Sequence, residues 1–167
     1  CSTTINTITI TVNPKPTLAA LPLTQTVCGS TPFANIAITN INSVAGTTFG
    51  WTRNNTLNVT GVASFGSGTA ISGTLTNTTN SNQTVTFTIA ALAGSCPSDV
   101  ITVDIVVLPT PLITVAPSTQ TRCHLQAITT LNFGNSNAVP GTTYSWTRDN
   151  TTNLTGIPAS GNGASLS

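Results

Sequence analysis

The sequence predicts an all-β protein made of tandem β-sandwich repeats, because its composition favours strands, its apolar residues alternate with threonine, and it repeats itself every 95 residues. Threonine accounts for 36 of the 167 residues and asparagine for 17, while methionine is absent. Threonine is β-branched and favours a pleated, half-exposed surface, and asparagine favours turns. Hydroxyl and amide groups are therefore expected to form most of the polar surface.

The low charge of the chain excludes several classes of function. Only 4% of the residues are charged and the net charge is +1, so the clustered Lys and Arg that a nucleic-acid binder needs are missing. The apolar runs, such as residues 105–108, are far shorter than the roughly 20 residues of a membrane-spanning helix. Neither nucleic acid nor insertion into a membrane is expected.

The repeat is visible when the chain is shifted by 95 positions. Cys1 then falls on Cys96 and Cys28 falls on Cys123, without any gap. The segment 46–56, GTTFGWTRNNT, matches GTTYSWTRDNT, and residues 17–72 contain 22 identities in 56 positions. Such similarity at a fixed period is the signature of tandem structural units.

The period also predicts how the chain is divided. Residues 1–16 correspond to the C-terminal strands of a preceding repeat, 17–111 to one complete repeat, and 112–167 to the N-terminal part of a following repeat. We therefore expect the chain to be a piece of a longer array. A Pro-x-Pro sequence at 14–16 and again at 109–111 predicts short, stiff connections, because proline restricts its own φ and the preceding residue.

Within the complete repeat, short strands separated by turns have the size and rhythm of an immunoglobulin-like sandwich. In 84–89 and in 101–107, apolar residues alternate with other residues, which predicts one buried and one exposed face. The intervening segment 94–99 has the Gly, Ser and Pro typical of a hairpin. Further strands are predicted at 35–39, 48–53 and 70–76.

Four aromatic residues are predicted to lie in the core: Phe49, Trp51, Tyr144 and Trp146. Phe49 and Trp51 are two positions apart, so both side chains should lie on the same face of a strand. A tryptophan on a central strand commonly packs beneath the disulfide of such a sandwich. The alternative is that Trp51 is exposed and stacks against a sugar.

The two cysteines within the complete repeat, Cys28 and Cys96, are predicted to form a disulfide. Closing a loop of about 70 residues would contribute ~4 kcal/mol. A free buried thiol at Cys28 is the alternative. Cys1 and Cys123 would pair outside this sequence or between chains. Widely spaced cysteines in a Thr-rich β chain favour an oxidising, extracellular location.

No catalytic, cofactor or metal site is predicted. The single histidine, His124, aligns with Gly29, so it is not a fixed part of the repeat. Asp99 and Asp104 lie at an odd spacing on one hairpin, which places them on different faces. Arg53 and its counterpart Arg148 could bind a ligand carboxylate, but such arginines more often lie along the sandwich edge or stack on an aromatic ring.

The order of motifs resembles a PKD-like repeat. It runs from VCGS at 27–30 through GTTFGWT at 46–52, VTFTI at 85–89 and GSC at 94–96 to IVVLPTP at 105–111. Such repeats occur in long surface proteins of Bacteroidota, including giant adhesins related to the gliding-motility adhesin SprB. The resemblance implies an immunoglobulin-like fold, export by the type IX secretion route and a surface filament. The second repeat departs from the pattern, with RCHL at 122–125 replacing the small residues that follow the cysteine.

Three functions are consistent with these observations. The first is a structural or adhesive stalk repeat of a cell-surface adhesin, whose partners are neighbouring repeats of the same chain. The second is a carbohydrate-binding module that recognises surface polysaccharide through exposed aromatic residues. The third is a filament subunit that joins other copies of itself, with residues 1–16 adding a strand to the open sheet of a neighbour.

Overall fold

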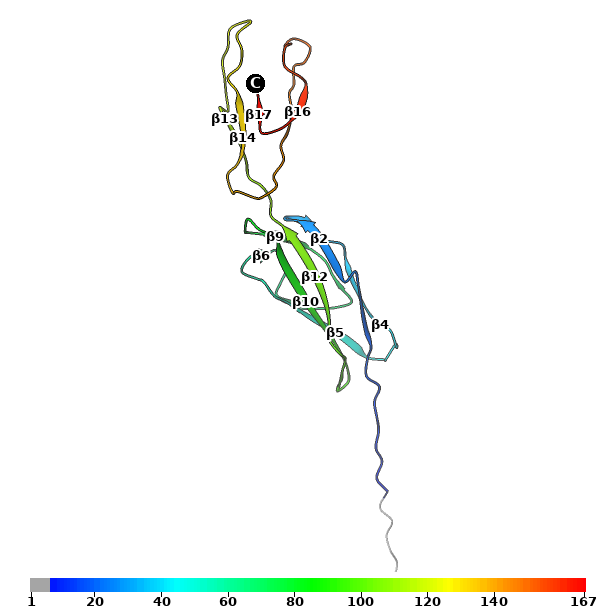
Figure 1. The fold of residues 1–167 in the computed structure, drawn as a ribbon. Coiled ribbons are helices and arrows are strands. Elements are labelled where there is room, and N and C mark those ends of the chain that lie inside the picture. The colour runs from blue at the N-terminus through cyan, green and yellow to red at the C-terminus, as the bar shows by residue number, and fades with distance from the viewer. Residues whose placement is uncertain (1–6) are drawn as a thin grey trace, which may run out of the picture.

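The structure is a computed structural model that describes residues 7–167, and Cys1 lies outside these residues. The prediction of an all-β fold is confirmed, because the described residues form strands and no helix. Figure 1 shows an elongated molecule, with residues 112–167 beyond one end of a central β-sandwich and the N-terminal segment leaving the other end. The strands of the sandwich are β1 (Leu18–Leu21), β2 (Thr24–Cys28), β3 (Thr31–Pro32), β4 (Ile36–Asn40), β5 (Thr47–Arg53), β6 (Val59–Thr60), β7 (Phe65–Ser67), β8 (Ala70–Ile71), β9 (Thr74–Asn77), β10 (Gln83–Ala93), β11 (Cys96–Pro97) and β12 (Ile101–Leu108).

One layer of the sandwich is a sheet with the strand order β2-β12-β10-β5-β7. Its centre is the antiparallel pair β10 and β12, in which Gln83 is opposite Val107 and Ile89 is opposite Ile101. β2 pairs with β12 in parallel, and the short β11 pairs with the end of β10. These registers place the end of β2 and the β10–β11 hairpin at opposite ends of the sheet.

The other layer consists of two small antiparallel sheets, β1-β4-β8 and β3-β9-β6. Apolar side chains from both layers meet in one buried cluster, in agreement with the predicted alternation in β10 and β12. Every buried apolar side chain in the described chain apart from Pro16 belongs to the interval from Ala20 to Val107. The complete repeat therefore contains its own core. The members of the cluster are Ala20, Phe33, Ile36, Ile38, Val59, Ile71, Leu75, Val85, Phe87, Ile89, Val103, Ile105 and Val107.

One predicted strand, 70–76, is divided in the structure. Its first part is β8, which pairs with β4, and its second part is β9, which pairs with β3 and β6. Gly73 separates them with a φ of 147°, a conformation that residues with a side chain rarely adopt. The prediction of one continuous strand was wrong, because the chain passes between the two small sheets at this glycine.

Residues 112–167 contain strands but no buried residue. The elements are β13 (Ile113–Ala116), β14 (Leu131–Asn135), β15 (Ser145–Thr147), β16 (Ser160–Asn162) and β17 (Ser165–Leu166). Positions 95 residues apart make the same hydrogen bonds in the two regions. For example, the side-chain amide of Gln25 donates to and its oxygen accepts from the backbone of Ala34, and Gln120 does the same with Thr129.

The N-terminal segment also matches a later part of the chain in the sequence repeat. Residues 7–17 form no strand, and Ile8, Ile10 and Val12 are 85%, 82% and 88% exposed. These three residues match Val103, Ile105 and Val107 in the sequence repeat, which are fully buried in β12. The boundaries at 16 and 111 between repeats remain a prediction.

Candidate functional site

The aromatic residues of the complete repeat bear on sugar binding, because an exposed ring would favour it. Trp51 lies on β5, is partly buried and packs against the core together with Phe49. Its ring meets the edge of Phe87 at a centroid distance of 5.6 Å and an angle of 66°. On another side it lies against Gly66, its cross-strand partner. Trp51 therefore does not present an open ring face of the kind that stacking on a sugar requires.

The corresponding aromatic residues of 112–167 are also partly buried. Tyr144 stacks on Phe133 with a centroid distance of 6.4 Å and an interplanar angle of 24°. Trp146 is opposite Gly161 across β15 and β16, as Trp51 is opposite Gly66. The contact between indole and glycine is thus a structural feature that recurs with the repeat.

Arg53 binds backbone carbonyl groups rather than a carboxylate. Its Nε and Nη2 donate to Val62 O at 2.9 and 2.6 Å, and its Nη1 donates to Val59 O at 3.1 Å. The side chain is 9% exposed, and burial lowers the pKa of its guanidinium group. Arg148 makes equivalent contacts with the carbonyl groups of Leu154 and Ile157. Both arginines hold the loop that follows their strand.

The predicted disulfide between Cys28 and Cys96 is wrong, and so is the placement of Trp51 beneath it. Both cysteines carry free thiols, and Cys28 is exposed rather than buried, so the alternative of a buried thiol is wrong as well. Cys28 is opposite Leu108 at one end of β12, whereas Cys96 pairs with Ala93 at the far end of β10. The length of β10 between these ends is about 30 Å at roughly 3.3 Å per residue. A disulfide requires Cα atoms within about 7 Å.

Cys123 is likewise an exposed free thiol.

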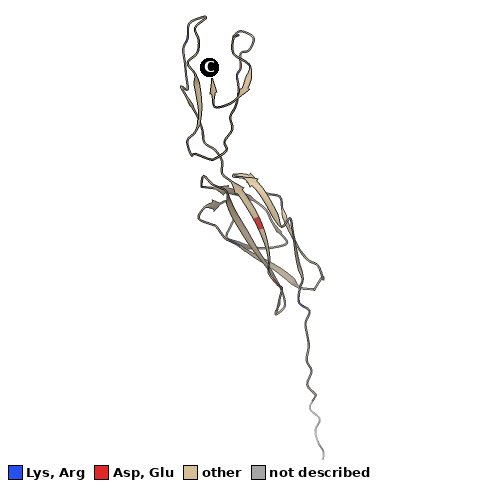
Figure 2. Cartoon of the chain, viewed as in Figure 1, with Lys and Arg blue, Asp and Glu red and all other residues tan. Residues whose placement is uncertain are grey.

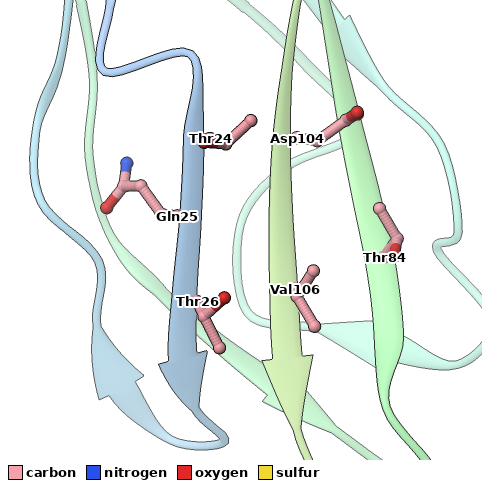
Figure 3. Close-up of a pocket in the computed structure, with 6 residues that line it drawn as sticks. All are labelled: Thr24, Gln25, Thr26, Thr84, Asp104 and Val106. Carbon is pink, nitrogen blue, oxygen red and sulfur yellow. The ribbon is translucent and has the colours of Figure 1, made fainter.

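The exposed face of the large sheet contains a shallow polar depression of about 440 Å³. Figure 3 shows that its walls come from β2, β10 and β12. Asp104, the one carboxylate, accepts a hydrogen bond from Thr86 Oγ1 at 2.7 Å, and the amide of Gln25 is occupied by Ala34. The residues that line it are Thr24, Gln25, Thr26, Thr84, Asp104 and Val106, none of them aromatic.

Charged groups are sparse over the whole described surface, and Figure 2 shows most of the ribbon in tan. Within residues 7–167, no three His, Cys, Asp or Glu side chains are grouped closely enough to hold a metal ion. The same residues form no helix long and apolar enough to cross a membrane. Asp99 makes an ion pair with Lys15, so the two aspartates of this region, Asp99 and Asp104, have different partners.

A recurring set of specific contacts lies at the linkers between repeats. At the preceding linker, residues 14–16, Asn42 Nδ2 donates to Lys15 O at 2.8 Å, and the N–H of Thr17 donates to Asn42 Oδ1 at 2.9 Å. Pro16 is fully buried. The ion pair between Lys15 and Asp99 adds a contact to the β10–β11 hairpin. The linker is thus docked onto the repeat that follows it.

The following linker, residues 109–111, is held from both sides. On the side of the complete repeat, Gly29 N donates to Leu108 O at 2.9 Å, and Thr110 Oγ1 donates to Gly29 O at 3.2 Å. On the other side, Asn137 Nδ2 donates to Thr110 O at 3.0 Å, and Leu112 N donates to Asn137 Oδ1 at 2.8 Å. Asn137 corresponds to Asn42, so both linkers are bound to the following repeat in the same way.

Sequence reasoning predicted stiff linkers from proline but did not identify Asn42 and Asn137. The signal was present, because both asparagines occupy the same position of the repeat and are identical. Their role depends on backbone groups 25 to 27 residues away, which no local pattern reveals. The linker 109–111 and the residues that bind it, Gly29 and Asn137, together form the joint between the two regions.

A family model described as PKD-like domain matches residues 25–111, just over half of the chain. The chain therefore belongs to the PKD-like domain family, in agreement with the predicted resemblance and with the observed sandwich. The match indicates no enzymatic family, and domains of this kind are typically non-catalytic. No curated protein matches the chain.

Proposed function

We propose that this chain is a structural spacer from a long surface adhesin, in which stacked repeats hold a distal part of the protein at a fixed distance. The joint carries this proposal, because the following linker is bonded to the repeat before it through Gly29 and to the region after it through Asn137. Contacts on both sides of a three-residue linker oppose bending in a way that a flexible tether does not. Proline at both ends of the linker adds to the stiffness.

The surface of the molecule supports the same function. Threonine and asparagine provide polarity with few charges, so stacked repeats neither repel nor attract each other strongly. We infer a position outside the cell from this composition together with the PKD-like family. Export by the type IX route and kinship with the gliding-motility adhesins of Bacteroidota are part of the proposal. Labelling intact source cells with an antibody against residues 17–111 tests the location.

The stiffness of the joint can be measured directly. The complete repeat has its own core, so residues 7–111 followed by a second copy of 17–111 form a two-repeat chain with one joint. Small-angle scattering in reducing buffer should show an extended particle with a narrow distribution of lengths. Asn42→Ala in the second copy, combined with Thr110→Val in the first, should broaden that distribution. Asn82→Ala, at an exposed position, is the matched control. A parent chain as flexible as the double variant would contradict the proposal.

Carbohydrate binding is the weaker candidate. The partly buried Trp51 is packed on Gly66 and Phe87, and the polar depression of Figure 3 has no aromatic lining residue. Titration of the two-repeat chain with soluble polysaccharides should leave tryptophan emission unchanged.

Self-assembly by strand addition is favoured by one observation, the exposure of Ile8, Ile10 and Val12 on a segment that matches β12. In the complete repeat, however, β12 pairs with β10 on one side and β2 on the other. A strand donated to a complete repeat would therefore find both of these neighbours already paired.

A further inference from the structure

The two cysteines of the complete repeat lie at opposite ends of the sandwich, and each is next to a linker. Cys28 ends β2 and is the strand partner of Leu108, the residue before the following linker. Cys96 lies in the β10–β11 hairpin, and its Sγ is 3.8 Å from the carbonyl oxygen of Asn13, the residue before the preceding linker. In Figure 1 the end of β2 faces residues 112–167, whereas the hairpin below β10 lies where the N-terminal segment leaves.

The sequence period relates these two places to each other. Asn13 and Leu108 are 95 positions apart and occupy the same point of the repeat. The linkers that follow them dock in the same way, through Asn42 and Asn137. The hairpin cysteine of a complete repeat after residue 111 would therefore lie against the carbonyl group of Leu108, as Cys96 lies against that of Asn13. Cys28 is already the strand partner of Leu108, so both cysteines would lie next to one residue.

We propose that in the tandem array the β2 cysteine of each repeat forms a disulfide with the hairpin cysteine of the next repeat. Neighbouring strands are about 4.8 Å apart. Disulfides join Cα atoms at about 4.4–6.8 Å. Two cysteines that both lie next to Leu108 have their Cα atoms in the range that a disulfide requires. The two cysteines of a single sandwich do not, because they lie at its opposite ends. The proposal extends the spacer function and rests on repeats that follow one another head to tail.

The reaction is the oxidation of two thiols by a disulfide oxidant, such as oxidised glutathione or an exported dithiol oxidase. Each thiol loses its proton, one thiolate attacks the oxidant, and the second thiolate displaces it from the mixed disulfide. The two electrons and two protons end on the oxidant, which leaves as two thiols. Successive bonds of this kind overlap along the array, so every residue of an interior repeat lies within a closed covalent loop. Force applied along the array could then not fully unfold one repeat between folded neighbours without breaking a disulfide.

Two variants of the two-repeat chain test the pairing. The joint variant keeps only Cys28 of the first copy and Cys96 of the second, with serine at the other two positions. The control keeps only Cys96 of the first copy and Cys28 of the second, which lie at the two far ends. After incubation in glutathione redox buffer, free thiols are alkylated and counted by mass spectrometry of the monomer. We expect loss of both alkylatable thiols in the joint variant, with both retained in the control.

Two outcomes would overturn the proposal: a folded joint variant that retains both thiols, or equal oxidation of the two variants. Circular dichroism establishes folding, and disulfide mapping of the two-repeat chain with all four cysteines provides a second, unsubstituted measurement. Scattering in reducing buffer separates this result from the spacer function. A stiff joint with unreacted thiols would refute only the disulfide, whereas a flexible joint in reducing buffer would refute the spacer.

Discussion

The indole of Trp51 lies so close to Gly66 that a Cβ atom on this residue would be 2.3 Å from Cζ2 of the ring. The two residues are opposite each other on β5 and β7. The same relationship recurs between Trp146 and Gly161, where the distance would be 2.5 Å. A glycine opposite the tryptophan is therefore a packing requirement of the repeat, since it lets the ring lie against the strand.

Gly66→Ala in residues 7–111 should lower the free energy of unfolding by about 1–3 kcal/mol, the usual cost of forcing extra atoms into a packed site. The indole cannot move away freely, because Phe87 lies against it. Urea denaturation measures the change. Gly50→Ala is the matched control, because its nearest non-neighbouring atom would be 3.9 Å away. Equal stability of the two variants would show that the ring adjusts without cost.

Arg53→Lys should destabilise the same chain by about 2–3 kcal/mol, because a lysine cannot reach the carbonyl groups of Val59 and Val62 together. The charge is unchanged, so the loss reports the geometry of the guanidinium group. The reciprocal substitution Lys15→Arg, on an exposed side chain, should leave the midpoint of urea unfolding unchanged. An Arg53→Lys variant of unchanged stability would mean that the loop is held without the hydrogen bonds of the guanidinium group.

Asn77→Ala should cost about 1–3 kcal/mol, because it removes the side-chain amide that donates to the carbonyl groups of Ser81 and of the buried Val107. Asn77 is 8% exposed, and its Nδ2 donates to Ser81 O at 2.7 Å and to Val107 O at 2.8 Å. Asn82→Ala, five residues away and exposed, is the control and should be neutral in thermal unfolding. If both variants melt alike, the amide of Asn77 is not needed to fix the end of β12.

The strands were the most predictable part of the molecule, because alternation of apolar residues is a local signal. The prediction for 84–89 falls within β10, and the prediction for 101–107 falls within β12. The 94–99 segment forms the expected hairpin. The division of 70–76 at Gly73 was missed, since a single glycine within a predicted strand does not reveal that the chain changes sheet.

The contacts of the joint and the position of the cysteines could not be predicted in this way. Both depend on which end of the sandwich each strand reaches, and this follows from the parallel pairing of β2 with β12. Counting cysteines within one repeat suggested an internal bond, because a sequence period does not tell which repeats touch. Arg53 was recognised as recurrent, but its backbone partners carry no side-chain signature.

Oxidation of residues 7–111 should leave their stability unchanged, because this chain contains only Cys28 and Cys96 and they lie at opposite ends of the sandwich. Urea unfolding of the monomer at low protein concentration, with and without oxidised glutathione, measures the difference. An internal disulfide would close a loop of about 70 residues and raise the free energy of unfolding by ~4 kcal/mol. The Cys28→Ser variant is the control, since it cannot form the bond and should unfold at the same midpoint in both buffers. A higher midpoint for the oxidised parent alone would place the two thiols together and would require a different pairing of β2 with β12.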